Sequence, residues 1–486
     1  MHLDPIRREV SAKLDRKQRS ALGQFMTPTN VADFMAGLFP PIKGNVRLLD
    51  AGAGIGSLSA AFLERWAREG QGLGHVDVTA YEIDPVLRAR LADTLAHYAV
   101  AYSVTSEIVD ADFIEDAVNR IQFQDVQRFT HAILNPPYKK INSQSRHRHL
   151  LRQVGIETVN LYSAFVALAI ALMQTGGQIV AIIPRSFCNG PYYKPFREFL
   201  LARTAIRHMH LFDARDKAFR DDEVLQENII LLLERGGEQG EVVVSTSTDD
   251  SFADYVAHAH PFSQIVLAND PERFIHVPAG TAHEASDLPD AFSHSLADLG
   301  VEVSTGPVVD FRAKDDLRDL PEPGCVPLLY PTHFSGQAIE WPKVGAKKPN
   351  ALRLNPETKK SLFPNGHYAV VRRFSSKEEK RRLVAALVSP AGFDTAYLGF
   401  ENHLNVFHRA KQGLPEDLTR GLVAYLNSSM VDAYFRRFSG HTQVNATDLR
   451  RMRYPSSNTL KKLGRWALKN GAVSQETLDK KILNLA

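Results

Sequence analysis

Cysteine is scarce in this chain. Cys188 and Cys325 are the only two among 486 residues, and neither belongs to a CxxC pair or a Cys/His cluster. A structural zinc site requires clustered Cys or His ligands, and a disulfide framework requires a larger, regularly spaced set of cysteines. We therefore expect two reduced thiols and no metal site.

Long apolar runs are also missing. The longest, residues 161–173, is shorter than the roughly 20 residues that a membrane-spanning helix requires. The first twenty residues are charged throughout and contain no apolar stretch of the signal-peptide type. We expect no membrane segment and a cytoplasmic protein.

The overall charge is nearly balanced, with 58 basic and 55 acidic side chains and a formal net charge of +3. The distribution is less even, because residues 343–382 hold twelve Lys and Arg against three acids, Glu357, Glu378 and Glu379. Such a stretch fits phosphate neutralisation, and it fits a solvated basic loop equally well.

The first half of the chain alternates short apolar runs with helical stretches. This pattern is typical of βαβ units and predicts a doubly wound, Rossmann-like α/β domain. A chain of 486 residues is too long for a single core, so two or three domains are expected. The predicted strands are 46–49, 76–81, 132–134, 178–183, 208–211 and 228–233, and the predicted helices are 58–68, 85–98 and 161–174.

The second half of the chain differs from the first in composition and in predicted secondary structure. Residues 236–251 are rich in Gly, Ser, Thr and acids and fit a linker or a peripheral strand, so we place the domain boundary at residue 250. Prolines and short strands dominate residues 278–364, and helical patterns return in 415–438 and 457–486. The prediction is an α/β domain over 1–250 followed by an α+β domain over 251–486.

A glycine-rich turn follows the first predicted strand. The strand ends in Asp50, and Gly52, Gly54 and Gly56 lead into the next helix. Glycines let the backbone approach a ligand closely, and the N–H groups that open a helix favour polar ligand groups. Nucleotide-binding domains of many kinds share this pattern.

Two further acids narrow the choice of ligand. Glu82 ends the second strand, where a carboxylate accepts both hydroxyls of a ribose and repels a ribose phosphate. Asp112 follows the third unit and suits an adenine amino group, with Phe113 covering the ring. No GxxxxGK[ST] motif is present, which favours S-adenosylmethionine, a nucleoside cofactor without phosphate. The alternative is that these acids only cap helices or turns.

The tetrapeptide Asn135-Pro136-Pro137-Tyr138 is the most informative stretch. The prolines make a rigid arch, so the Asn135 side-chain oxygen and the Pro136 carbonyl can accept both hydrogens of a planar amino group. Held in this way, the amino nitrogen attacks a sulfonium methyl directly, without a covalent enzyme intermediate or a strong general base. Tyr138 would stack on a base that has left the duplex. The competing interpretation is a Pro-Pro turn with a surface tyrosine.

The ordered motifs resemble the gamma-class amino-methyltransferases of restriction–modification systems, the adenine-specific, TaqI-like group. The resemblance begins at Gly23 and implies that Phe25, Thr27 and Pro28 wrap the methionine end of the cofactor. The cofactor-binding residues predicted are Phe25, Thr27, Pro28, Asp50, Gly52, Gly54, Glu82, Ile83, Asp112, Phe113 and Asn135.

The resemblance also extends to residues 182–200, where this family has an aromatic that stacks on the other face of the extruded adenine. It assigns this role to Tyr193, with Tyr192 in reserve. Ordinary loop or core aromatics are the alternative. The predicted catalytic residues are Asn135, Pro136, Pro137, Tyr138 and Tyr193.

Two C-terminal segments, 303–312 and 439–450, are similar to parts of target-recognition domains. Small and polar side chains there suit phosphate and base-edge contacts, and they also suit a plain turn and helix cap. The DNA-binding candidates are Gly306, Gly440, Thr442, Gln443 and Asn445.

The resemblance implies site-specific methylation of adenine in double-stranded DNA by a monomer or dimer, with a separate cognate restriction endonuclease as a partner. Methylation of the cytosine amino group, of RNA or of a protein glutamine remains open, as does a modification subunit that needs a specificity subunit. Carbon-5 cytosine methylation is disfavoured because neither cysteine follows a proline. No acidic cluster of the nuclease type stands out, so we expect no cleavage by this chain.

Overall fold

The computed structural model describes residues 26–69, 74–123, 128–212, 227–268, 270–278, 292–375, 379–438, 443–471 and 473–485. The chain divides into two compact units, Met1–Ala285 and Ser286–Ala486. The boundary predicted at residue 250 falls between β8 (Val242–Ser247) and β9 (Val256–His260). These strands pair antiparallel in one sheet, so backbone hydrogen bonds keep β9 in the first unit.

The first unit is built on a nine-stranded sheet with the order β3-β2-β1-β4-β5-β7-β6-β8-β9. β7 runs antiparallel between β5 and β6, and β1 to β5 are parallel. The predicted doubly wound α/β fold is confirmed, with β3, β8 and β9 added to the six predicted strands. The strands are β1 (Val46–Ala51), β2 (Val76–Tyr81), β3 (Val104–Val109), β4 (Phe129–Leu134), β5 (Met173–Pro184), β6 (Thr204–Phe212), β7 (Asn228–Arg235), β8 and β9.

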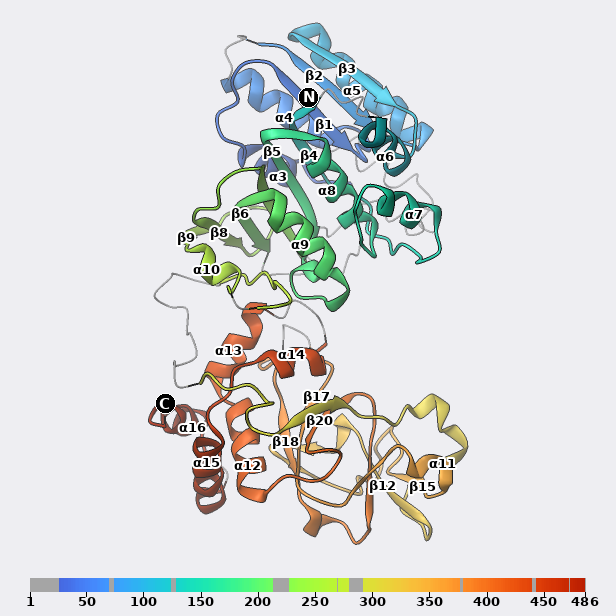
Figure 1. Cartoon of the computed structure of the whole chain (residues 1–486), viewed down its shortest axis with the longest axis vertical. Helices are drawn as coiled ribbons and strands as arrows, with labels where there is room; N and C mark the ends of the chain where they lie inside the picture. Colours follow the sequence, from blue (N-terminus) through green and yellow to red (C-terminus); the bar gives the residue numbers. More distant parts are fainter. Residues whose placement is uncertain are drawn as a thin grey trace. The chain divides into compact units, whose positions relative to one another are not determined.

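Helices cover both faces of this sheet (Figure 1). Side chains alternate along each strand, so Leu48 of β1 joins the core under α3, α4 and α5, whereas Leu49 joins the core under α6, α8 and α9. A sheet buried on both faces explains the continuous apolar runs in the sequence. The helices are α3 (Thr29–Gly37), α4 (Ser57–Glu69), α5 (Pro85–Ala101), α6 (Phe113–Phe123), α7 (Arg146–Gln153), α8 (Leu161–Leu172), α9 (Lys194–Arg203) and α10 (Phe262–Ile265).

The second unit contains two sheets, with the orders β10-β20-β17-β18-β14-β13 and β11-β15-β12-β19-β16. Its short strands joined by turns fit the many prolines of this part of the sequence. The strands are β10 (Glu302–Thr305), β11 (Leu317–Arg318), β12 (Cys325–Leu329), β13 (Phe334–Ser335), β14 (Ala338–Ile339), β15 (Ala351–Arg353), β16 (Leu362–Pro364), β17 (Tyr368–Arg372), β18 (Ala385–Val388), β19 (Tyr397–Phe400) and β20 (Leu404–His408).

Helices complete the second unit. The helical pattern predicted over 415–438 is two helices. Asn427 is the C-cap of the first, and its side chain bonds to the backbone N and O of Ala385 at 3.1 and 2.9 Å. The pair predicted over 457–486 is present. The helices are α11 (Pro356–Lys359), α12 (Glu416–Leu426), α13 (Ser429–Phe438), α14 (Ala446–Arg451), α15 (Ser457–Asn470) and α16 (Gln475–Leu483).

No helix in the described part of the chain is both long and apolar enough to cross a membrane. Cys188 is buried, and neither it nor Cys325 forms a disulfide. The described residues contain no group of three or more His, Cys, Asp or Glu side chains that could hold a metal ion.

Candidate active site

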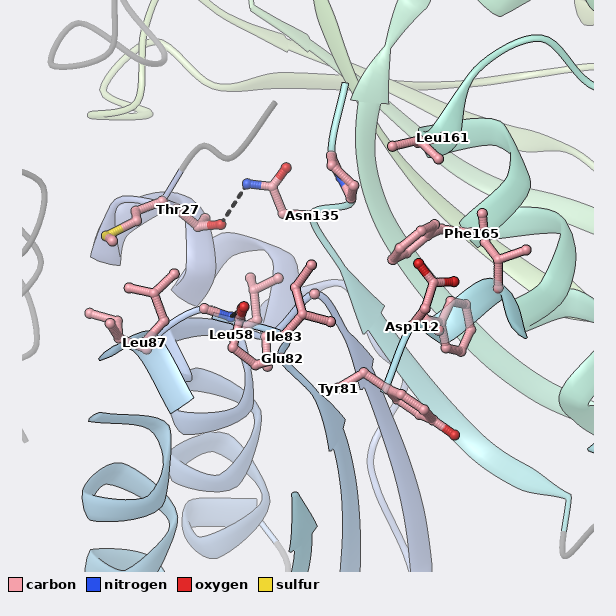
Figure 2. Close-up of a pocket in the computed structure, with 18 of the residues that line it drawn as sticks. Thr27, Leu58, Tyr81, Glu82, Ile83, Leu87, Asp112, Asn135, Leu161 and Phe165 are labelled. Atoms are coloured by element: carbon pink, nitrogen blue, oxygen red, sulfur yellow. Dashed lines mark hydrogen bonds between the residues drawn. The ribbon is translucent and has the colours of Figure 1, made fainter. Parts of the chain in front are cut away.

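A cavity of about 340 Å³ opens at the carboxyl ends of β1, β2 and β4 (Figure 2). In a doubly wound sheet this edge is where ligands bind, because the strand order reverses between β1 and β4. Most of the predicted cofactor residues meet there, although they come from separate parts of the sequence. Those that line the cavity are Thr27, Gly52, Gly54, Glu82, Ile83, Asp112, Phe113, Asn135 and, from the catalytic prediction, Pro137.

The glycine turn forms one wall. Gly52, Gly54 and Gly56 have φ of 80°, 60° and 86°, a left-handed backbone that other residues rarely adopt. The Gly52 N–H donates to the Tyr81 carbonyl at 3.0 Å, and the Gly54 N–H donates to Glu82 Oε2 at 2.9 Å. These bonds attach the turn to the end of β2.

Glu82 is buried with both carboxylate oxygens engaged. Besides the bond from Gly54, its Oε1 accepts from the Asp84 N–H at 2.8 Å. Burial raises the pKa of Glu82, and the backbone bonds from Asp84 and Gly54 oppose that rise. Each oxygen retains a further acceptor position, which suits a pair of ribose hydroxyls.

Asp50 does not line the cavity. It points to the same face of β1 as Leu48, under α4, where Ser59 Oγ donates to its Oδ2 at 2.6 Å. Complete burial raises the pKa of Asp50 to about 7, and the Ser59 bonds limit that rise. The sequence predicted that Asp50 contacts the cofactor, but its side chain lies beneath the glycine turn and not in the cavity.

Asp112 and aromatic rings form the opposite wall. Asp112 Oδ1 accepts from the Glu115 N–H at 3.1 Å, and Asp112 Oδ2 lies 3.1 Å from His147 Nε2. The Phe113 ring packs against Phe165 with a centroid distance of 4.9 Å. Figure 2 shows Asp112 beside Phe165, which gives this wall a polar acceptor next to an apolar surface.

The tetrapeptide predicted to be catalytic, residues 135–138, follows β4 at the same edge. Asn135 Nδ2 donates to Thr27 Oγ1 at 3.0 Å, the dashed line in Figure 2. The Tyr138 hydroxyl donates to Asn135 Oδ1 at 3.2 Å and lies 3.3 Å from the Ile182 carbonyl. The amide orientation is therefore determined from both sides. Burial of the Tyr138 hydroxyl raises its pKa, which keeps it a donor.

The two predicted base-stacking tyrosines both contact a third one, Tyr162. The Tyr162 ring is 6.2 Å from Tyr138 at an angle of 83° and 5.7 Å from Tyr193 at 28°. Neither Tyr138 nor Tyr193 lines the cavity, and neither do Pro28 and Pro136. Tyr192 is 76% exposed. Stacking on a base remains a prediction for Tyr138 and Tyr193.

Comparisons with known proteins bear on this site. The family model described as Eco57I restriction-modification methylase matches residues 93–219. The chain is 53% identical to the type II methyltransferase M.BsuBI of Bacillus subtilis over 477 residues, which cover 96% of this chain and 95% of that protein. It belongs to the type II methyltransferases. The resemblance to restriction–modification methyltransferases is thereby confirmed, and the protein is a DNA methyltransferase.

A second relative and one solved structure agree. M.PstI of Providencia stuartii is 43% identical over 470 residues, 94% of this methyltransferase and 92% of that one. The structure of the DrdV–DNA complex superposes with a TM-score of 0.51 at 14% identity, covering 96% of this chain and 59% of the other. That likeness supports the fold.

Several residues that line the methyltransferase cavity were not predicted from the sequence, and among them are Lys139, His147, Leu161 and Phe165. Leu161 and Phe165 were detectable, because residues four apart share one face of a helix and Asn160 caps α8 just before them. His147 has no comparable signal. It lies in a stretch without regular spacing and meets Asp112 from 35 residues away.

The predicted recognition residues of the methyltransferase lie in its second unit. The Gly306 N–H donates to the Leu404 carbonyl at 2.8 Å, and a Cβ on Gly306 would collide with the Glu401 carbonyl. Gly306 is therefore held in a close backbone contact. Asn445 caps α14, with its N–H donating to Asp448 Oδ2 at 3.0 Å. Phe25, Gly440 and Thr442 lie outside the described residues.

One buried side chain joins the two predicted recognition segments. Asn405 of β20 accepts from Thr305 Oγ1 at 3.4 Å, and its Nδ2 donates to the Val444 carbonyl at 2.7 Å. Gln443 Oε1 accepts from Arg373 at 3.3 Å beside this junction. Asn405 thus connects the segments 303–312 and 443–450, although 100 and 39 positions separate it from its two partners. The segments also meet directly, because Arg450 Nε donates to the Val303 carbonyl at 3.2 Å.

Proposed function

We propose that this methyltransferase transfers a methyl group from S-adenosylmethionine to the exocyclic amino group of adenine in double-stranded DNA. One observation carries the proposal. The amide of Asn135 faces the same cavity as the glycine turn, Glu82 and Asp112. The acceptor for an amino group and the binding groups for a nucleoside are therefore neighbours.

The cavity fits S-adenosylmethionine. Glu82 suits the ribose hydroxyls and Asp112 the adenine amino group, while Ile83, Phe113 and Phe165 supply apolar walls. Two carboxylates favour a cofactor with a sulfonium and an ammonium group, and they disfavour nucleotide phosphates. When bound, S-adenosylmethionine supplies an electrophilic methyl group.

Asn135 and Pro136 hold the acceptor amine. Thr27 fixes the Asn135 amide so that its oxygen is presented as an acceptor, and the Pro136 carbonyl accepts the second amino hydrogen. Accepting both hydrogens shifts the nitrogen towards tetrahedral geometry, which frees its lone pair for in-line attack. The proton leaves after the transfer, so no strong base is needed.

The target base must leave the duplex to reach Asn135. Tyr138 and Tyr193 are the proposed stacking partners, and Tyr162 contacts the ring of each. In the second unit, the segments joined by Asn405 are proposed to read the target sequence, with Gln443 at a base or phosphate. A separate cognate endonuclease would cleave the same sequence when it is unmethylated.

The test is methylome sequencing of DNA from a methylation-deficient host that expresses the chain. We expect N6-methyladenine at one sequence motif, because the tetrapeptide begins with Asn rather than the Ser typical of cytosine amino-methylation. Asn135→Ala should abolish the mark, and Asn470→Ala, at an exposed asparagine of α15, should preserve it. Cytosine marks alone, or full activity of Asn135→Ala, would refute the proposal.

A further inference from the structure

The segment that follows the catalytic tetrapeptide returns to the cofactor cavity. It leaves β4, forms α7 and closes on itself at its base, where the Ile141 N–H donates to the Val159 carbonyl and the Leu161 N–H to the Lys139 carbonyl, at 2.9 and 2.8 Å. His147 is in the first turn of α7 and lines the cavity. The tetrapeptide proposed to hold the target base and the segment that follows it therefore both contribute side chains to the cavity.

His147 is aimed at Asp112. The two side chains are joined by the 3.1 Å contact of Nε2 with Oδ2, while the other oxygen of Asp112 accepts from the backbone of Glu115. Ring nitrogens and carboxylate oxygens at this distance form a hydrogen bond. A carboxylate has about four acceptor positions, so Asp112 can hold His147 and Glu115 and still accept from a ligand.

We propose that His147 is a positioning residue of the cofactor site, which orients the Asp112 carboxylate so that it accepts a hydrogen bond from the adenine amino group of S-adenosylmethionine. This inference rests on the proposed function in taking that cofactor as the ligand. It adds a residue from the segment after the tetrapeptide to the adenine end of the site.

The electrostatics agree with the geometry. Burial raises the pKa of Asp112, but the hydrogen bond and charge of His147, together with backbone hydrogen bonds from Glu115 and Ile114, place the pKa of Asp112 below its ordinary value. The same bond raises the pKa of His147 above its ordinary value. Glu115 on α6 adds to that rise and Arg146 on α7 opposes it, while Lys139 and Glu82 also line the cavity.

The same helix offers two matched controls. Arg146 pairs with Glu115 at 2.9 Å and so attaches α7 to α6 without lining the cavity. His149 is exposed two residues further along. Removal of the Arg146–Glu115 pair tests whether attachment of α7 to α6 is all that cofactor binding requires. Substitution of His149 controls for the loss of any histidine from this helix.

The experiment is calorimetric binding of S-adenosylmethionine to the full chain at pH 7.5. We expect His147→Ala to weaken binding about tenfold, the usual cost of losing a hydrogen bond to a charged group. His147→Gln keeps an N–H donor and should recover most of the affinity. Arg146→Gln and His149→Ala should bind within about twofold of the wild type. Melting temperatures without ligand establish that each variant is folded. If His147→Ala is not folded, the pH profile of His147→Gln is compared with that of the wild type instead.

The pH profile separates positioning from packing. Without His147, the pKa of Asp112 should rise, because the bond that lowers it is gone while burial remains. A protonated carboxyl is a poorer acceptor, so the acid limb of the binding profile should move to higher pH in His147→Ala and, to a smaller extent, in His147→Gln. It should not move in His149→Ala.

Two results would overturn the inference. Equal affinity and equal pH profiles for the wild type and both His147 variants would leave His147 without a role at Asp112. An equal loss in Arg146→Gln would show that docking of α7, not the bond to Asp112, is what matters. Failure of the wild-type protein itself to bind S-adenosylmethionine would instead contradict the proposed function, so the two failures are distinguishable.

Discussion

At the scale of single residues, the orientation of one amide governs the proposed chemistry. Asn135 Nδ2 donates to Thr27 Oγ1 at 3.0 Å, and this bond helps to present the amide oxygen as an acceptor. Thr27 is 5% exposed, so water is a poor substitute for its hydroxyl. We therefore expect the Thr27 side chain to contribute to catalysis through Asn135, in addition to its proposed place beside the cofactor.

Thr27→Val removes the hydroxyl and keeps the shape. We expect the single-turnover rate of methyl transfer to fall about tenfold, which corresponds to the loss of one buried hydrogen bond. Thr27→Ser retains the acceptor and should stay within about twofold of the wild-type rate. An unchanged rate for Thr27→Val would show that the Thr27 hydroxyl is not needed to orient Asn135.

Asp50 makes stability depend on pH. Burial raises its pKa to about 7, well above the value of about 3.9 for an unfolded chain. The folded protein thus binds this proton more tightly, and the free energy of unfolding should decline as pH rises from about 4 to 7. Asp50→Asn does not titrate. Urea denaturation measures the free energy of unfolding at pH 5 and at pH 8. From pH 5 to pH 8 this free energy should change in favour of the variant, relative to the wild type, by a few kcal/mol, on the order set by this pKa difference. Parallel pH profiles for the two proteins would contradict the prediction.

At the scale of elements, α12 and α15 cross in backbone contact. A Cβ on Gly421 would collide with the Leu460 carbonyl, and one on Gly464 would collide with the Asp417 carbonyl. Neither glycine has a positive φ, so close approach is the reason for glycine at both positions. This crossing lies beside the main core of the second unit.

Gly421→Ala should force these helices apart and lower the free energy of unfolding of the second unit by about 2 kcal/mol or more. Gly392→Ala is the matched control, since a Cβ there meets nothing within 4 Å. Differential scanning calorimetry should show a lower transition for the first variant only. S-adenosylmethionine binding should be unchanged in both, because the cavity residues all belong to the first unit.

At the scale of the whole molecule, a net charge of +3 gives little general attraction for DNA. Attraction to phosphates must come from a local excess of positive charge, and residues 343–382 carry such an excess. Lys347 and Lys380 of this stretch are exposed. Several of its other cations have partners in the protein, such as Lys348 with Asp310 at 2.7 Å.

Lys347→Gln combined with Lys380→Gln should reduce the dependence of DNA affinity on salt. For each phosphate that a lysine no longer neutralises, the slope of log K against log salt becomes shallower by about 0.9. Lys469→Gln, at an exposed lysine of α15, should leave the slope unchanged. Fluorescence anisotropy with a labelled duplex over a salt series measures it. An unchanged slope in the double variant would identify 343–382 as a solvated basic face.

The sequence alone determined the doubly wound fold class, the glycine turn and the tetrapeptide proposed to hold the target amine. These follow from local patterns, and the carboxyl ends of parallel strands bring such residues to one edge whatever the details of packing. Tertiary structure decided what depends on side-chain direction and long-range contact. Strand alternation turned Asp50 away from the cavity, α7 brought His147 to Asp112, and β20 placed Asn405 between two distant segments. No local spacing encodes such meetings, because they arise only when separate elements pack.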